Sequence, residues 1–165
     1  MLQRFFVACA IAMLLAPAIS FGQFKQGDFT IEVGANGFAA KGGSLDTFNL
    51  SIQSSPQYFL TDQIAVGLRN QVNWTDGGSF RDGSILADLD YHFELGKCVP
   101  YIGANIGYQY GDAFEDSWVA GPEAGVKVFL NSTTFLDFQV AYEWNLNNGI
   151  DQGGYFYGLS IGVRL

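Results

Sequence analysis

The chain has 165 residues, which suits one domain, and carries a formal net charge of −8. Lys and Arg are half as frequent as Asp and Glu, 8 against 16, which argues against nucleic acid as a partner because phosphate binding needs a basic surface. Beyond residue 22 no apolar stretch is long enough for a membrane helix.

The first 22 residues have the features of a secretory signal peptide. Arg4 precedes the apolar run "FFVACAIAMLLAPAI", and the small residues Ser20 and Gly22 mark a cleavage site after Gly22. The alternative is an N-terminal anchor helix, which the short run and Pro17 disfavour. We therefore predict export through the Sec pathway and one domain over residues 23–165.

Cysteine use is sparse. Cys9 would leave with the signal, so Cys98 remains without an internal disulfide partner. We expect Cys98 to have no role, and an intermolecular pair is the alternative.

Eight segments of the exported chain place apolar residues at every second position, the pattern of strands. The first carries Phe29, Ile31 and Val33, and the last, "YGLSIGVRL", alternates large residues with Gly, Ser and Arg. About ten residues is the length with which a tilted strand crosses a bilayer. The segments are 28–39, 47–60, 64–74, 84–93, 100–110, 118–130, 135–145 and 157–165.

The connections alternate between long and short. Long, polar, glycine-rich stretches occupy 39–46, 75–83, 111–117 and 145–154, and short turns occupy 61–62, 94–98 and 131–134. Short turns face the periplasm and long loops face outside in outer-membrane barrels. The predicted fold is all-β, an eight-stranded antiparallel up-and-down transmembrane β-barrel with both termini on the periplasmic side. We expect the eighth strand to close against the first near residues 29–33.

Each predicted strand has an apolar face and a second face formed by the residues between the apolar ones. The composition of the second face indicates that the apolar face is the one that meets lipid. The second face carries glycines where a soluble sheet would show charged residues to water, and glycine is normally avoided in strands. A narrow lumen explains this choice, because an eight-stranded barrel is just wide enough for side chains to fill it. These glycines are Gly34, Gly67, Gly103, Gly107, Gly121, Gly125, Gly158 and Gly162.

The charges on this second face have mixed signs, so we predict a lumen filled by ion pairs. Arg69 is expected beside Asp88, Lys127 beside Asp137, and Arg164 beside Glu32. A solvated face with incidental pairs is the alternative. The predicted lumen charges are Glu32, Arg69, Asp88, Glu123, Lys127, Asp137, Glu143 and Arg164.

Aromatic residues form two predicted bands, as at the two interfaces of a membrane. Chance clustering in a β protein is the competing account. The loop-side band contains Trp74, Trp118, Trp144, Tyr108, Tyr110, Tyr142, Tyr155 and Tyr157, and the turn-side band contains Tyr58, Tyr91, Phe93 and Phe135.

Three segments, "SPQYFLTDQIAVGL", "PYIGANIGY" and "GPEAGVKVFL", resemble strands of the small outer-membrane β-barrel domain family, the OmpA/OmpX-like porin-family proteins. The resemblance implies a Gram-negative outer membrane, contact with its lipid and lipopolysaccharide, and insertion by the barrel-assembly machinery. Family members commonly end in an aromatic residue, whereas this chain ends in Leu165. No peptidoglycan-binding segment follows, so the anchoring role of longer relatives does not carry over.

Catalysis and metal binding are weakly indicated. His92, the only histidine, lies at the turn-side end of its strand, and Glu94 stands where similar barrel deacylases carry a serine. The acidic loop with Asp112, Glu115 and Asp116 could bind Ca²⁺ weakly, but its spacing matches no calcium loop. We expect no cofactor, no metal and no catalytic residue.

The predicted function is thus a non-enzymatic outer-membrane barrel that serves envelope structure or surface interaction through its loops. A lipid-modifying enzyme, a narrow channel and a soluble lipocalin-like binder remain alternatives. The extracellular ligand has no sequence signature.

Overall fold

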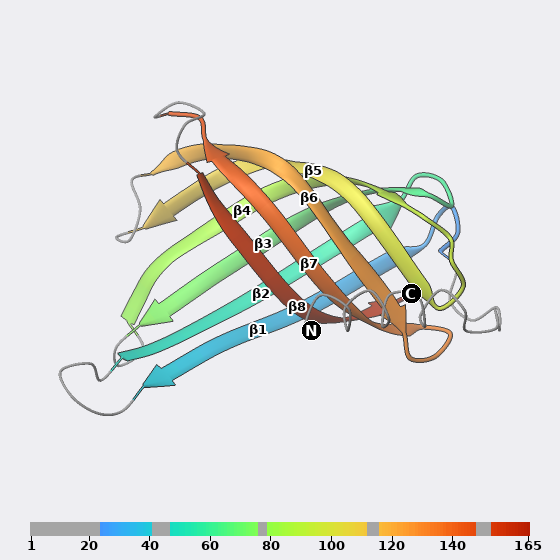
Figure 1. Ribbon diagram of the computed structural model, residues 1–165, viewed down its shortest axis with the longest axis horizontal. Coiled ribbons are helices and arrows are strands. Elements are labelled where there is room, and N and C mark those ends of the chain that lie inside the picture. Colours follow the sequence, from blue (N-terminus) through green and yellow to red (C-terminus); the bar gives the residue numbers. More distant parts are fainter. Residues whose placement is uncertain (1–23, 41–46, 76–78, 112–115, 148–152) are drawn as a thin grey trace, which may run out of the picture.

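The computed structural model describes residues 24–40, 47–75, 79–111, 116–147 and 153–165. The predicted signal peptide, residues 1–22, lies outside this part. Eight strands form a closed antiparallel barrel in which each strand pairs with the next in sequence (Figure 1), which confirms the predicted fold class. The strands are β1 (Phe29–Ala40), β2 (Thr47–Phe59), β3 (Ile64–Thr75), β4 (Ser79–His92), β5 (Cys98–Gly111), β6 (Ser117–Phe129), β7 (Thr134–Asn145) and β8 (Gly153–Arg164).

The short connections between β2 and β3 and between β6 and β7 are closed by side chains that cap the turn. Thr61 Oγ1 accepts a hydrogen bond from the Ile64 amide at 2.9 Å, and Asn131 Oδ1 accepts one from the Thr134 amide at 2.8 Å. Thr and Asn favour such turns because their side chains hydrogen-bond nearby backbone groups. Together with the β4–β5 turn they define one end of the barrel, here called the turn end; the opposite end is the loop end.

The connection between β3 and β4 is shorter than predicted. The stretch 75–83 was predicted as a loop, but β3 reaches Thr75 and β4 begins at Ser79. The two strands stay paired through Val72–Gly83 and Asn73–Asp82, and the register shifts between Asn73 and Trp74. A bulge of this kind lets pairing continue through residues whose composition resembles a loop.

The seam between β1 and β8 closes the barrel, as predicted. Residues 30–34 pair with residues 160–164, and the Leu165 amide donates to the Phe29 carbonyl at 2.8 Å. The seam has five residue pairs, fewer than any other strand pairing of the barrel.

The outer surface of the barrel is apolar. Leu68, Leu89 and Ile102 point outward from three different strands and are 54–56 % exposed. An apolar surface that extends around a barrel in this way marks contact with a membrane or a partner. No helix in the described part of the chain is long and apolar enough to cross a membrane.

The inner face is crowded, which accounts for its glycines. A Cβ atom built on Gly34 would lie 2.8 Å from the Leu159 carbonyl oxygen, and those built on Gly67 and Gly103 would collide with the carboxylates of Asp88 and Asp90. Real Cβ atoms do not approach so closely, so these positions need glycine for close packing.

The chain that precedes β1 folds back under the barrel. Gly27 has a φ of 91°, a left-handed conformation that favours glycine, and its amide donates to the Phe59 carbonyl at 2.9 Å. This bend places Phe24 in the lumen, where its side chain is buried.

Candidate functional site

The lumen at the turn end contains an aromatic layer. The Phe24 ring lies 4.2 Å from the Phe59 ring, 5.1 Å from Phe129 and 5.6 Å from Phe135, measured between centroids. Ala65 and Val99 complete this buried cluster. Phe135 was predicted in the turn-side aromatic band, and this was wrong: it belongs to the opposite face of β7 from Leu136 and Phe138, so it points inward.

His92 lies against this layer, between rings. The centre of its imidazole is 5.0 Å from that of the Phe59 ring and 5.2 Å from that of the Tyr101 ring, with an angle of 30° between the His92 and Tyr101 ring planes. Neither ring nitrogen has a hydrogen-bond partner in the described part of the chain. A general base needs a nucleophile within reach and a group that orients the imidazole, so this geometry gives no support to a catalytic role.

The first ion-pair cluster lies next to the aromatic layer. The Lys127 ammonium on β6 contacts Asp137 Oδ2 on β7 at 3.0 Å and also contacts Glu32 Oε1 on β1. The Tyr101 hydroxyl donates to Asp137 at 3.1 Å, and the Ser160 hydroxyl donates to Glu32 at 3.0 Å. Lys127 is 1 % exposed, so its charge depends on these carboxylates.

The second ion pair crosses the barrel. Arg69 Nη2 on β3 donates to Glu123 Oε2 on β6 at 2.7 Å, and Asn105 Nδ2 donates to the same oxygen at 2.7 Å. The predicted Arg69–Asp88 pair was wrong. In the register of β3 and β4, Arg69 faces Leu86 and Asp88 faces Gly67, so the guanidinium reaches across the lumen instead.

Asp88 and Asp90 lie on β4 beside this pair, and neither forms an ion pair among the described residues. Gln57 Nε2 donates to Asp88 Oδ2 at 3.2 Å and to Asp90 Oδ2 at 2.9 Å. Asp90 is missing from the predicted lumen charges, although its position two residues after Asp88 places it on the same strand face. That spacing could have identified it.

The remaining predicted charges lie nearer the ends of the barrel. Arg164 was predicted beside Glu32, and this was wrong: its Nη1 lies 3.6 Å from Asp28 Oδ2 at the turn end, where both side chains are about one-fifth exposed. Glu143 accepts a hydrogen bond from Gln109 Nε2 at 2.8 Å near the loop end.

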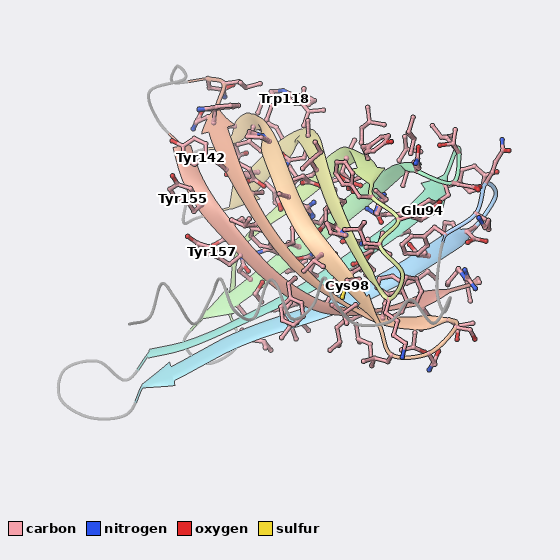
Figure 2. All side chains as sticks on the ribbon, turned by 45° about the vertical axis from the view of Figure 1, so that its right-hand side comes forward. Glu94, Cys98, Trp118, Tyr142, Tyr155 and Tyr157 are labelled. Carbon is pink, nitrogen blue, oxygen red and sulfur yellow. The ribbon has the colours of Figure 1, made fainter. Side chains whose placement is uncertain are left out.

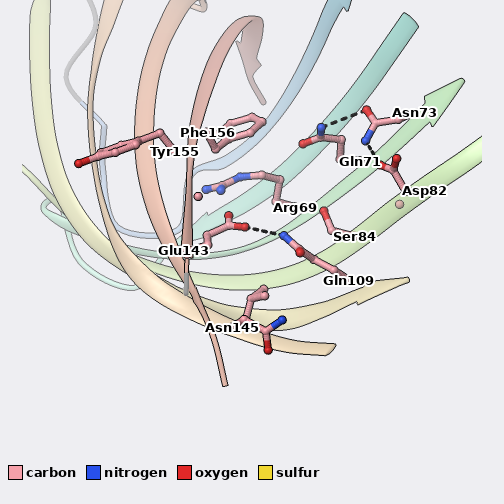
Figure 3. Close-up of a pocket in the computed structure, with 14 residues that line it drawn as sticks. Arg69, Gln71, Asn73, Asp82, Ser84, Gln109, Glu143, Asn145, Tyr155 and Phe156 are labelled. Carbon is pink, nitrogen blue, oxygen red and sulfur yellow. Dashed lines mark hydrogen bonds between the residues drawn. The ribbon is translucent and has the colours of Figure 1, made fainter. Parts of the chain in front are cut away.

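A polar cavity, here called the vestibule, occupies the loop end of the lumen (Figure 3). Its volume is about 410 Å³. Gln71 Nε2 donates to Asn73 Oδ1 at 3.2 Å, and Asn73 contacts Asp82. Arg69 also lines the vestibule, with its guanidinium carbon 5.7 Å from the centre of the Phe156 ring.

Aromatic side chains gather outside the barrel near the loop end, where Figure 2 shows Trp118, Tyr142, Tyr155 and Tyr157. Tyr142 packs against Tyr155 at 4.9 Å between ring centroids, and Trp118 packs against Tyr108 at 5.7 Å. Tyr91 and Phe93 pair at 5.1 Å near the turn end.

Two other sequence features can be placed only in part. Cys98 is a half-buried free thiol at the start of β5. Asp116 is exposed and accepts a hydrogen bond from the Gly111 amide at 3.1 Å, whereas Asp112 and Glu115 lie outside the described residues.

Solved structures share this architecture. The N-terminal β-barrel domain of OprF from Pseudomonas aeruginosa aligns with a TM-score of 0.63 and 21 % identity, over 85 % of this chain and 98 % of that one. The chain has the fold of small outer-membrane β-barrels. OprG of the same bacterium gives a TM-score of 0.57 at 16 % identity, over 88 % and 99 % of the two chains. Neisserial surface protein A gives 0.54 at 19 % identity, over 84 % and 94 %. No protein-family model and no characterised relative matches the sequence.

Proposed function

We propose that this protein is an integral outer-membrane barrel with a filled lumen and no catalytic activity, which serves envelope structure or surface interaction. The observation that carries the proposal is the combination of an apolar outer surface with a lumen occupied by buried charged and aromatic side chains. In this proposal the outer surface contacts lipid, including lipopolysaccharide, and the barrel-assembly machinery inserts the chain.

The side chains that fill the lumen argue against an open pore. Two ion-pair clusters and the aromatic layer follow one another from the vestibule to the turn end, and Lys127, Arg69, Phe24 and Phe59 are each 2 % exposed or less. A water-filled channel would leave such side chains accessible, as in larger barrels.

Fractionation of expressing Gram-negative cells is the first test. We expect the protein in the outer-membrane fraction, with a gel mobility that changes on boiling because the folded barrel resists detergent. A water-soluble monomer recovered without detergent would overturn the proposal in favour of a soluble binder.

Conductance measurements test the filled lumen, and analysis of lipid A tests the absence of catalytic activity. The purified barrel in a planar bilayer is expected to give no reproducible conductance steps, with a known porin as the positive control. Lipid A from expressing cells should match that from cells with the empty vector. A modification that disappears in His92→Ala would instead establish a lipid-modifying enzyme.

A further inference from the structure

The lumen holds an excess of buried negative charge. Between the vestibule and the aromatic layer there are two buried cations, Arg69 and Lys127, in the described part of the chain. Lys127 is engaged by two carboxylates and Arg69 by Glu123. Five carboxylates share this space, three more than the cations can neutralise; they are Glu32, Asp88, Asp90, Glu123 and Asp137.

Among the described residues, the carboxylates without an ion pair, Asp88 and Asp90, lie next to Glu123, the partner of Arg69. Asp88, Asp90 and Glu123 each offer an oxygen, and these oxygens lie within 4.8 Å of one another. Asp88 Oδ1, Asp90 Oδ1 and Glu123 Oε1 are buried and have no hydrogen-bond partner. A buried carboxylate without a partner is costly, so this arrangement favours either a bound cation or a proton shared between carboxyl groups.

Two amide groups end at the same point. Gln57 contacts Asp88 and Asp90, Asn105 contacts Glu123, and both side chains are at least 95 % buried. Gln57 Oε1 and Asn105 Oδ1 have no partner either. Each amide faces the carboxylates with its nitrogen. Rotation of the amide about its terminal bond would turn the partnerless oxygen toward them instead.

The backbone is shaped to hold these carboxylates. Asp90 lies over Gly103 and Asp88 lies over Gly67, and a Cβ atom at either glycine would collide with the carboxylate. The glycines thus leave the space that the carboxylates occupy on β4.

We propose that Asp88, Asp90 and Glu123 bind a divalent cation, Ca²⁺ being the best fit, and that the amides of Gln57 and Asn105 rotate so that their oxygens face the ion. Ca²⁺ takes six to eight oxygens at about 2.3–2.6 Å in flexible geometry, so two ligands of one ion lie about 5 Å apart or less. Mg²⁺ demands stricter geometry and retains water. The vestibule ends at Arg69, which contacts Glu123, so an ion from the loop end would pass this guanidinium.

Calorimetry on the full barrel tests the proposal directly. The protein is purified from membranes in detergent, treated with EDTA, and titrated with CaCl₂ or MgCl₂. We expect one Ca²⁺ per barrel, weaker binding of Mg²⁺, and a higher unfolding temperature in Ca²⁺. Absence of saturable binding of either ion would overturn the proposal and leave protonated carboxyl groups as the source of neutrality.

Asp90→Asn provides the matched variant because it removes a charged ligand at constant shape. Its Ca²⁺ affinity should fall about tenfold or more, and the Ca²⁺-dependent rise in unfolding temperature should disappear. Asp62→Asn, a carboxylate outside the lumen, should bind Ca²⁺ as the wild type does. If Asp90→Asn fails to fold, the Ca²⁺ affinity of Asp88→Asn and the metal content of the purified wild-type barrel test the proposal in its place. Unchanged affinity in a folded Asp90→Asn or Asp88→Asn barrel would overturn the proposal.

Discussion

Arg69 on β3 and Glu123 on β6 form an ion pair of 2.7 Å that crosses the interior of the barrel. Both side chains are almost completely buried, so each charge depends on the other. Arg69→Met should cost about 3–5 kcal/mol of unfolding free energy, because it leaves Glu123 buried and uncompensated. Urea unfolding of the barrel in lipid vesicles measures this.

The Arg69→Met/Glu123→Gln double variant is the control for that prediction. It removes both charges together and should recover part of the lost stability. A double variant no more stable than Arg69→Met would contradict the pairing.

Phe24→Ala should weaken the aromatic layer at the turn end. Phe24 contacts the rings of three phenylalanines and of His92. Its loss leaves a cavity among them, which typically costs about 3–5 kcal/mol. Phe24→Leu keeps most of the volume and should lose less. Equal unfolding free energies for the two variants would argue that Phe24 does not fill the lumen.

Arg164→Gln should assemble almost as well as the wild type. The Arg164–Asp28 contact is long, at 3.6 Å, and partly exposed, and pairs of this kind contribute about 1 kcal/mol or less. The yield of folded, heat-modifiable protein in membranes measures assembly. If Arg164→Gln lowers the yield of folded protein as much as Arg69→Met does in the same assay, the assignment of Arg164 to the rim is contradicted.

Leu68→Arg tests whether the outer face meets lipid. Leu68 lies near the middle of β3 and points outward, where an arginine facing the bilayer centre costs about 2–4 kcal/mol. Leu130→Arg, in the turn after β6, should cost about 0–1 kcal/mol because it lies near the interface. If the two variants unfold with the same free energy in vesicles, the outer face does not span the bilayer as proposed.

The turn-end pair Lys25–Asp62 predicts a specific titration. The Gln26 backbone amide, 2.8 Å from Asp62 Oδ1, and the Lys25 ammonium, 3.1 Å from Oδ2, lower the pKa of Asp62. A lowered carboxyl pKa contributes stability above the unfolded-state pKa of about 3.9, and this is lost as pH falls through the folded value.

Nuclear magnetic resonance of the Asp62 carboxyl carbon checks this sign. Its midpoint should lie below that of aspartate in an unstructured peptide, and Lys25→Met should raise it in part because the backbone donor remains. A midpoint at or above the peptide value would refute the contact.

The sequence predicted the strands and their outward faces because both depend on short-range alternation. Leu68 and Ile102 face outward as their period-two pattern requires, and the seam between residues 30–34 and 160–164 followed from the even number of strands. The same parity places Asp90 and Phe135 inside, so these two could have been assigned from the sequence.

What the sequence by itself determined is the eight-stranded barrel and which residues share its interior. The tertiary structure alone decided which interior charges meet. Lys127 and Asp137 are opposite each other on adjacent strands, so hairpin geometry brings them together. Arg69 and Glu123 are on strands that are not adjacent, and their contact depends on strand tilt, stagger and side-chain reach across a closed lumen. In the closed barrel Arg164 lies at the rim beside Asp28. Gln57, Asp90 and Asn105 lie close together because the curvature of the barrel places residues from distant strands at the same depth.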